Sequence, residues 1–358
     1  MGDTIKPFLE LKGITKRFGS FDAVKQVDLE ITEGEFFTLV GPSGSGKTTM
    51  IRMLVGMDRP SFGEIRLNGA VLNDVPANKR PTCMVFQSLA LFPHKTVGEN
   101  IEFPLKIAGV SAAERRKSAE QLLEQLRLPL SYYSKGVNQC SGGERQRIAL
   151  ARALAFNPQI LFFDEPLSAL DYRLRKALEK ELKDIHRETG KTFVYITHSL
   201  EEAMVMSDRI GIMRDGELVQ VGLPSEIYNQ PKNKFVAQFM GEVNTFEVEK
   251  AGDNAVKTIE GDHQFQVNRD LTDFSKGFLI VRPEVMKIGP EAESLPNRIN
   301  GVLFNDYALG SRVQYQVRSA DSTAHWLVEK LQDDPFEGQV DAPVVLGWRS
   351  EDSILVDE

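Results

Sequence analysis

Cysteine is scarce in this sequence, and its two cysteines, Cys83 and Cys140, stand far apart. Two isolated cysteines match neither a disulfide framework nor a paired metal-ligand pattern, so we expect a reducing compartment. The five histidines show no HExxH or HxH spacing. This argues against a transition metal bound by the protein.

Long apolar runs are also missing. No stretch approaches the ~20 apolar residues that a membrane-spanning helix needs. The first residues lack a basic segment followed by an apolar core, so we expect no secretory signal. A composition of 41% hydrophobic and 26% charged residues is typical of a soluble globular protein. We therefore expect a cytoplasmic chain.

Charge is shared unevenly along the 358 residues, a length that suits two domains. Residues 244–358 carry 11 basic and 21 acidic side chains, a formal charge of −10, whereas residues 1–243 carry 32 basic and 30 acidic side chains. This asymmetry predicts domains at 1–243 and 244–358. It also argues against nucleic acid as a partner of the acidic part.

Short apolar runs between helical patterns predict the core of the first domain. "FFTLV" (36–40), "ILFF" (160–163) and "TFVYIT" (192–197) are typical of buried strands in a mainly parallel sheet covered on both faces. The amphipathic run "SAAERRKSAEQLLEQLRL" predicts a helix within an all-helical subdomain at about 95–158. After residue 241, runs such as "SRVQYQV" predict short antiparallel strands in a small barrel.

The stretch "GPSGSGKT", residues 41–48, fits the phosphate-loop pattern GxxxxGK[ST] between a predicted strand and a predicted helix. Glycines let the backbone wrap phosphates, and a helix N-terminus attracts negative charge. Lys47 is expected to reach the β- and γ-phosphates, and the Thr48 hydroxyl to bind Mg²⁺. The predicted nucleotide-binding residues here are Gly41, Pro42, Ser43, Gly44, Ser45, Gly46, Lys47, Thr48 and Thr49.

Two acids follow the apolar run "ILFF". Asp164 falls at the carboxyl end of this strand, where α/β sheets bind ligands, and suits the Mg²⁺ shell. Glu165 could polarise a water that attacks the γ-phosphate. Alone, such a pair is more often a charge pair at a helix N-terminus. His198 after "FVYIT" and Gln87 in "VFQ" are ordinary residues when taken alone.

A second anion site is predicted in "QCSGGERQRIALARAL", residues 139–154. Ser141, Gly142 and Gly143 open a helix whose first backbone N–H groups lack intrahelical acceptors.

Taken together, these motifs resemble those of ATP-binding cassette (ABC) ATPases over about residues 8–240. The set comprises the phosphate loop "GPSGSGKTT", "VFQ", the signature "CSGGERQR", "ILFFDEP", "SALD" and "ITHS". The resemblance implies two copies packed head to tail, with Ser141 and Gly143 of one copy closing over the γ-phosphate held by Lys47 of the other. Asp171 would connect the two sites.

The resemblance also implies roles for single residues in the ATP site. Gln87 would sense the metal and the attacking water, and His198 would hold the γ-phosphate and Glu165. Phe18, in "KRFGSF", matches the position that stacks on adenine; the alternative is a buried core aromatic. The signature departs from the common LSGGQ at Cys140 and Glu144, and we expect both changes to be tolerated.

Several functions share this ATPase core. A P-loop kinase or GTPase would leave "CSGGERQR" and "SALD" unexplained. A DNA-repair ATPase would carry a long heptad insertion, and a translation factor usually carries two cassettes. The apolar run 89–93, "LALFP", suits a groove for a helix of a membrane partner and favours the motor subunit of an importer; ordinary core packing is the alternative.

The last third resembles the oligonucleotide-fold-like TOBE domain of importer ATPases, in "FLIVRPEVMKI" and "VVLGWRSEDSILV". The runs "AQFMGEVNTF" and "LALFPH" are most similar to ATPases of polyamine (spermidine/putrescine) importers; importers of ferric iron, sugars or inorganic anions are the alternatives. The resemblance implies a homodimer on the inner face of the cell membrane. Its partners would be two permease subunits and, indirectly, an extracytoplasmic solute-binding protein.

Overall fold

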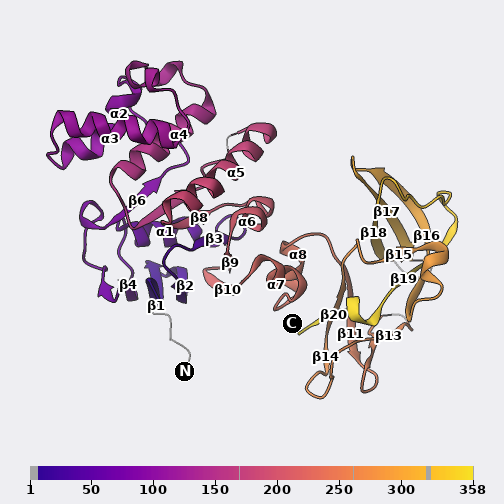
Figure 1. The fold of residues 1–358 in the computed structure, drawn as a ribbon. Helices are drawn as coiled ribbons and strands as arrows, with labels where there is room; N and C mark the ends of the chain where they lie inside the picture. Colours follow the sequence, from indigo (N-terminus) through magenta and orange to yellow (C-terminus); the bar gives the residue numbers. More distant parts are fainter. Residues whose placement is uncertain (1–6, 169, 261, 320–323, 358) are drawn as a thin grey trace, which may run out of the picture. The chain divides into compact units, whose positions relative to one another are not determined.

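The computed structural model describes residues 7–168, 170–260, 262–319 and 324–357. The chain forms two compact units, Met1–Pro224 and Ser225–Glu358 (Figure 1). The distribution of charge predicted a boundary after residue 243. In the structure, α8 (Lys234–Phe239) packs with the second unit, so the boundary falls earlier, after Pro224. Ala237 of α8 lies in one apolar cluster with Ile280 and Val356.

The first unit contains a six-stranded sheet and a four-stranded antiparallel sheet. The pairs from β9 to β6 in the larger sheet are parallel, and β10 joins β9 antiparallel, so the predicted mainly parallel sheet is confirmed. In spatial order the larger sheet is β10 (Glu217–Gly222), β9 (Arg209–Arg214), β3 (Phe36–Val40), β8 (Thr192–Ile196), β7 (Ile160–Asp164) and β6 (Thr82–Val85). The smaller sheet is β2 (Phe21–Ile31), β1 (Leu9–Phe18), β4 (Phe62–Leu67) and β5 (Ala70–Val71).

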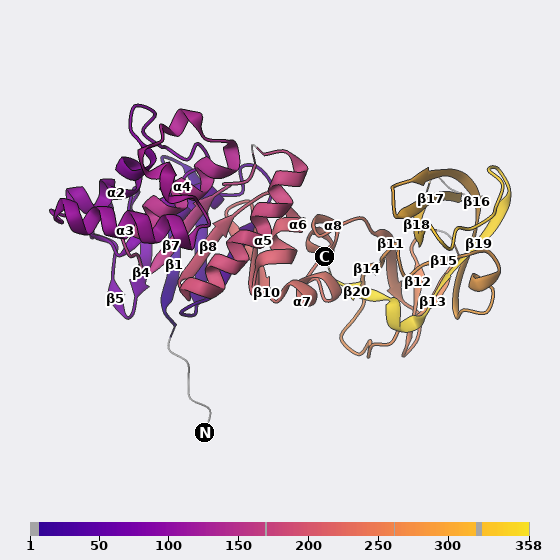
Figure 2. The same cartoon turned by 45° about the horizontal axis from the view of Figure 1, so that its top comes forward.

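Alternate residues of the central strands face two separate cores, as the strand period of two requires. Phe162 and Val194 pack with α1 and the smaller sheet, whereas Phe163 and Tyr195 pack with the helices of the other face. The helices of this unit are α1 (Lys47–Val55), α2 (Val97–Ile107), α3 (Ala112–Gln125), α4 (Gly142–Ala155), α5 (Tyr172–Thr189) and α6 (Leu200–Met206). Figure 2 shows α2, α3 and α4 gathered at one end of the unit. These helices fall within residues 95–158, the range of the predicted helical subdomain.

Arg80 anchors the carboxyl end of α1 from inside the protein. Its side chain is buried, and it donates hydrogen bonds of 2.7–2.8 Å to the carbonyls of Met53, Leu54, Leu72 and Val75. Met53 and Leu54 lie in the last turn of α1, where carbonyls lack intrahelical donors. A cation at this end also complements the helix dipole. Arg80 therefore fixes the helix whose other end forms the phosphate loop.

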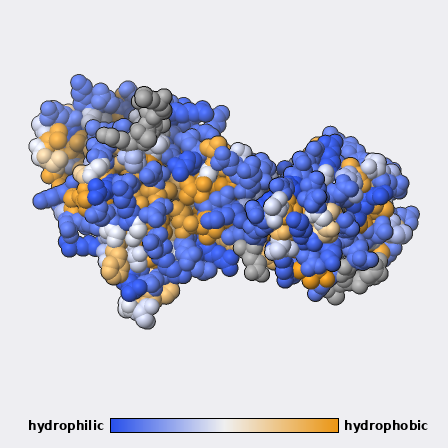
Figure 3. All heavy atoms as spheres, turned by 90° about the horizontal axis from the view of Figure 1, so that it is seen from below, coloured by the Kyte–Doolittle hydropathy of each residue, from blue (hydrophilic) through white to orange (hydrophobic). Residues whose placement is uncertain are grey.

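The second unit contains two five-stranded antiparallel sheets around one shared apolar core, so the predicted antiparallel strands are confirmed. One sheet is β13 (Gln264–Gln266), β12 (Ala255–Thr258), β11 (Asn244–Lys250), β14 (Lys276–Val281) and β20 (Ile354–Val356). The other is β15 (Lys287–Ile288), β19 (Pro343–Trp348), β16 (Asn297–Ala308), β17 (Arg312–Ser319) and β18 (His325–Leu331). Hydrophilic residues cover most of the face of this unit seen in Figure 3.

Two buried asparagines, each at the start of a central strand, hydrogen-bond to an edge strand of the other sheet. Asn244 of β11 exchanges hydrogen bonds with the backbone of Leu327 in β18, at 2.7 and 2.8 Å. Asn297 of β16 does the same with Gln266 in β13, at 2.6 and 2.9 Å. Each side-chain amide replaces one step of a backbone ladder, which satisfies polar groups at strand edges inside the unit.

We predict that Asn297→Ala lowers the free energy of unfolding of the second unit by about 2 kcal/mol, because the Gln266 backbone loses both partners. Both tryptophans of the chain, Trp326 and Trp348, lie in the core of this unit, so urea denaturation followed by tryptophan fluorescence reports on it alone. Asn300→Ala, at an exposed position of β16, is the control. Equal stability of the two variants would contradict the bridging role.

Candidate functional site

A cleft of about 780 Å³ opens beside the amino end of α1. Its lining comes from the phosphate loop, from the β1–β2 hairpin and from the segments that follow β7 and β8. The lining residues are Phe18, Phe21, Ala23, Ser43, Gly44, Ser45, Gly46, Lys47, Thr48, Thr49, Glu165 and His198. The structure thus brings most of the predicted ATP-site residues into one place.

The phosphate loop runs from the end of β3 to the start of α1. Gly46 has a φ of 101°, and a Cβ there would lie 2.5 Å from the carbonyl oxygen of Ala23. Only glycine fits this conformation and this space. The tight turn aims the first N–H groups of α1 at the cleft, and the helix dipole makes this end attractive to an anion.

Lys47, the first residue of α1, is buried and points back along the loop. Its Nζ donates to the carbonyls of Gly41 at 2.7 Å and Pro42 at 2.9 Å. Burial lowers the pKa of Lys47, and the charges of Glu165 and Asp164 oppose that shift. The charges of both carboxyl groups thus act on Lys47, and Lys47 and Glu165 both line the cleft.

Asp164 is the last residue of β7, and Glu165 follows it. Burial raises the pKa of Asp164, the nearby Glu165 raises it further, and Lys47 opposes the change. The next helix, α5, begins only at Tyr172, so the alternative of a helix N-terminal charge pair is wrong. Glu165 adopts a left-handed φ of 46°, which costs a non-glycine residue about 1–2 kcal/mol. Backbone strain of this kind clusters at functional sites.

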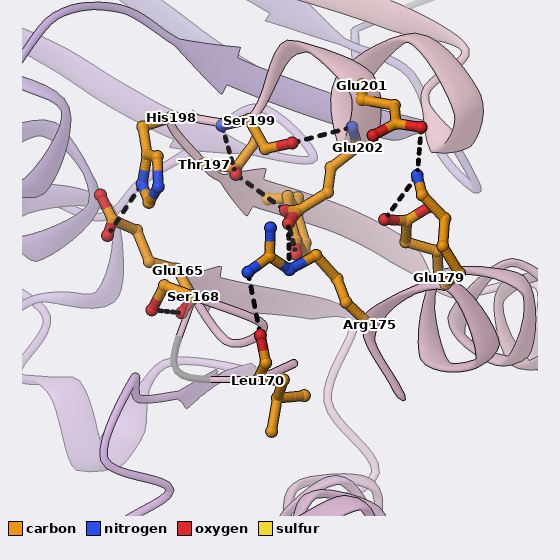
Figure 4. Close-up of polar contacts among 12 residues, drawn as sticks. Glu165, Ser168, Leu170, Arg175, Glu179, Thr197, His198, Ser199, Glu201 and Glu202 are labelled. Carbon is orange, nitrogen blue, oxygen red and sulfur yellow. Dashed lines mark hydrogen bonds and ion pairs between the residues drawn. The ribbon is translucent and has the colours of Figure 1, made fainter. Parts of the chain in front are cut away.

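His198 lies next to Glu165. Its Nδ1 is 3.3 Å from Oε2 of Glu165, and the imidazole is largely exposed in the cleft (Figure 4). The two residues meet because β7 and β8 are parallel neighbours, and the backbone N–H of Glu165 donates to the carbonyl of Ile196 at 2.9 Å. The histidine can thus orient the carboxylate or share a proton with it.

Ser168 links Gln87 to Glu165, a role that the sequence analysis missed. The amide of Gln87 donates to the Ser168 hydroxyl at 3.0 Å, and that hydroxyl donates to the carbonyl of Glu165 at 2.9 Å. The motif "SALD" contains this serine, but nothing in its spacing assigns the contact. Ala169, the second residue of that motif, lies outside the described residues.

Two phenylalanines lie at the tip of the β1–β2 hairpin. Phe18 and Phe21 are paired across the hairpin, and 51% and 64% of their surfaces are exposed. The alternative that Phe18 is a core aromatic is therefore wrong. Phe21, which the sequence analysis did not single out, adds a second aromatic side chain to the same cleft. Exposed rings beside a phosphate-binding loop can stack on a base.

The signature residues lie outside this cleft. Ser141 is exposed and is the N-cap of α4; Gly142 lines a separate cavity of about 380 Å³; and Gly143 packs against Leu174. Asp171 is exposed and caps α5 by accepting from the N–H of Leu174 at 3.1 Å. Within one chain, the signature residues and Asp171 therefore do not line the cleft that contains the phosphate loop.

Glu144 is folded back onto its own chain. Its carboxylate accepts the backbone N–H of Ser141 and the hydroxyl of Tyr132, both at 2.7 Å. Both hydrogen bonds hold the pKa of Glu144 below its usual value, and the bond from the Ser141 N–H has the larger effect. The acid thus completes a capping box, a role that glutamine fills equally well. Buried Cys140 contributes its thiol to the adjoining apolar core.

The cavity beside Gly142 also involves the segment after β6. Leu89, Leu91 and Pro93 line it, together with Gln87. Leu89 and Ala90 are both left-handed, with φ of 61° and 46°. Arg152 of α4 holds this turn by donating to both of their carbonyls at 2.7 Å. Arg152 therefore connects the segment that follows Gln87 to α4, the helix that begins at the signature motif.

We predict that Glu144→Ala lowers the free energy of unfolding by about 1 kcal/mol through loss of the cap, whereas Glu144→Gln changes it little. Thermal unfolding followed by circular dichroism at 222 nm measures both. Arg145→Ala, the exposed neighbour, is the control. A Gln variant as unstable as the Ala variant would show that the charge matters rather than the cap.

Comparison with known proteins agrees with this geometry. A family model described as "ABC transporter" matches residues 24–168. The chain is 42% identical over 353 residues to the spermidine/putrescine import ATP-binding protein PotA of Chromobacterium violaceum, covering 95% of this chain and 97% of the relative. It is 41% identical over 360 residues to the protein of the same description from Thermobifida fusca, covering 98% and 94%.

A solved structure shares the fold of the first unit. The ATP-binding cassette MJ0796, described as a dimer in a post-hydrolysis state bound to ADP and Pi, is 36% identical with a TM-score of 0.53. The match covers 60% of this chain and 98% of that one, and it confirms the expected α/β cassette. This chain belongs to the ABC transporter family, among the ATP-binding proteins of its importers, and is an ATPase of that family.

Proposed function

We propose that this chain hydrolyses ATP to drive the uptake of spermidine and putrescine through a membrane permease. One observation carries the ATPase part: a single cleft contains the phosphate loop, Lys47, Glu165, His198 and two exposed aromatic rings. The choice of polyamines rests on the relatives, which are described as spermidine/putrescine import proteins and match nearly the whole chain, second unit included.

In this proposal each part of the cleft has one task. The N–H groups of the loop and Lys47 bind the phosphates, and Phe18 stacks on the adenine with Phe21 beside it. Glu165 takes a proton from the attacking water, and His198 holds Glu165 and the γ-phosphate in place. Ser168 fixes the backbone of Glu165 and the amide of Gln87 relative to each other.

The donor set also fits a magnesium ion. The exposed Thr48 hydroxyl, the Asp164 carboxylate and the Gln87 amide oxygen are oxygen ligands, which Mg²⁺ prefers in combination with waters and phosphates. When bound with ATP, the ion neutralises charge on the phosphates. The described residues contain no group of three or more His, Cys, Asp or Glu side chains that could hold a metal alone.

We infer that the working form is a homodimer. Ser141, Gly142 and Gly143 present the start of α4 away from the chain's own cleft, as expected if they close the cleft of a second copy. Asp171 would lie at the same interface. The dimeric state of the matching MJ0796 cassette supports this arrangement.

The membrane partners follow from the importer assignment. We expect two permease subunits, reached through the cavity lined by Leu89, Leu91 and Pro93, and an extracytoplasmic protein that delivers the solute. The chain would work on the inner face of the cell membrane. Within the described residues, every helix is too short or too polar to span a bilayer.

The second unit is proposed to be an oligonucleotide-fold-like TOBE domain with a dimerisation or regulatory role. Two sheets around one core, with an asparagine on a central strand of each sheet bonded to an edge strand of the other, support a closed barrel. The charge of −10 in residues 244–358 argues against nucleic acid as its ligand.

We predict that Glu165→Gln lowers ATP turnover by about 100-fold or more and traps an ATP-bound dimer, because the water loses its base while the phosphate-binding groups remain. Sedimentation at micromolar protein with ATP and Mg²⁺ measures the dimer. Lys47→Ala, which lacks the phosphate-binding amine, is the control and should stay monomeric. A monomeric Glu165→Gln variant would contradict the shared site.

A further inference from the structure

A buried carboxylate lies behind the histidine segment, away from the cleft. Glu202 of α6 is only 3% exposed (Figure 4). Its Oε2 accepts the hydroxyls of Tyr195 and Thr197, each at 2.8 Å. A buried acid is costly unless several groups hydrogen-bond to it or carry opposite charge, so a carboxylate in this place must be held by a specific network.

That network includes hydrogen bonds to the residues on both sides of His198. Thr197, which precedes it, donates its hydroxyl to Glu202 and accepts the backbone N–H of Ser199 at 2.9 Å. Ser199, which follows it, accepts the backbone N–H of Glu202 at 3.2 Å as the N-cap of α6. Both neighbours of the histidine are therefore tied to one residue, while the imidazole itself stays exposed.

The other carboxylate oxygen reaches the segment that follows Glu165. Oε1 of Glu202 lies 3.9 Å from Nε of Arg175, a charge contact longer than a hydrogen bond. Arg175 in turn donates to the carbonyl of Leu170 at 2.9 Å. Leu170 lies between Ser168, which bonds to the carbonyl of Glu165, and Asp171, which caps α5.

These contacts connect the His198 segment and the segment that follows Glu165 from two sides. On the cleft side, His198 touches Glu165 directly at 3.3 Å. On the buried side, Glu202 accepts the Thr197 hydroxyl and Arg175 donates to the Leu170 carbonyl, so the Arg175–Glu202 contact joins the same two segments. Arg175 Nε has no hydrogen-bond acceptor in the described part of the chain, so the Arg175–Glu202 contact attracts by charge without locking one geometry.

We propose that Glu202 is a positioning residue: it holds the His198 segment and, through Arg175, the Leu170 segment in the arrangement that ATP hydrolysis needs. The inference deepens the proposed ATPase function and rests on it. Glu202 does not touch the cleft, so its effect must pass through His198 and the Leu170 segment.

The neighbouring Glu201 offers a matched control. It lies on the same helix, has the same chemistry and pairs with Lys176 at 2.7 Å, but its side chain is 60% exposed. Exposed pairs contribute little to stability. Loss of the Glu201 charge therefore reports the effect of removing a carboxylate from α6 without disturbing the histidine segment.

The test uses the full-length chain and steady-state ATP hydrolysis. We expect Glu202→Ala to lower kcat about 100-fold, the loss that a misplacement of about 1 Å causes, with KM for ATP changed little. The near-isosteric Glu202→Gln keeps an acceptor for the hydroxyls and should lower kcat about tenfold, through the lost attraction of Arg175. Glu201→Gln should hydrolyse ATP like the unmodified chain.

A double-mutant cycle separates positioning from general destabilisation. In a His198→Ala background, Glu202→Ala should cost less than in the unmodified background, because the part of its effect that passes through Thr197 to the histidine is gone. Equal losses in the two backgrounds, or a Glu202→Gln variant as active as Glu201→Gln, would overturn the inference. Lys47→Ala in the same assay tests the proposed function itself: an active Lys47→Ala variant would refute the ATPase site, whereas an inactive one leaves only the role of Glu202 at stake.

Discussion

The parallel pairing of β7 with β8 is the constraint on which the site depends. Asp164 stands opposite Ile196 in this ladder, and the backbone N–H of Glu165 continues it by one bond. Because parallel strands end at the same edge of a sheet, the residues that follow them must emerge side by side. On the other side of β8, Leu39 of β3 stands opposite Ile196, so the phosphate loop begins at the same edge.

This edge can hold polar groups because the strands behind it are apolar on both faces. Phe163 and Tyr195 serve one core, and Phe162 and Val194 serve the other. The resulting sheet is rigid, and rigid strands place side chains more accurately than free loops do. The left-handed φ of Glu165 is the local cost of turning the chain there. Hydrogen bonds from Ser168 and to Ile196 hold that turn.

The fold of the first unit could be predicted from local patterns, since apolar runs mark its strands and closely spaced glycines mark its phosphate loop. Phosphate-loop, Asp164 and Glu165 chemistry follows from motifs whose residues are adjacent in sequence. Contacts such as Gln87–Ser168 and Arg175–Glu202 could not be predicted, because they join segments that only the tertiary structure brings together. The role of Glu144 likewise depended on Tyr132, which lies 12 residues earlier on a different element.

The most direct test of the account is to recover this chain from membranes of its native host in mild detergent, using a tag, and to identify what accompanies it by mass spectrometry. The account predicts two polytopic membrane proteins in comparable amounts, with an extracytoplasmic protein that binds spermidine or putrescine as a further partner. Recovery of ribosomal, DNA-bound or soluble partners alone would contradict the transport function and leave only the ATPase.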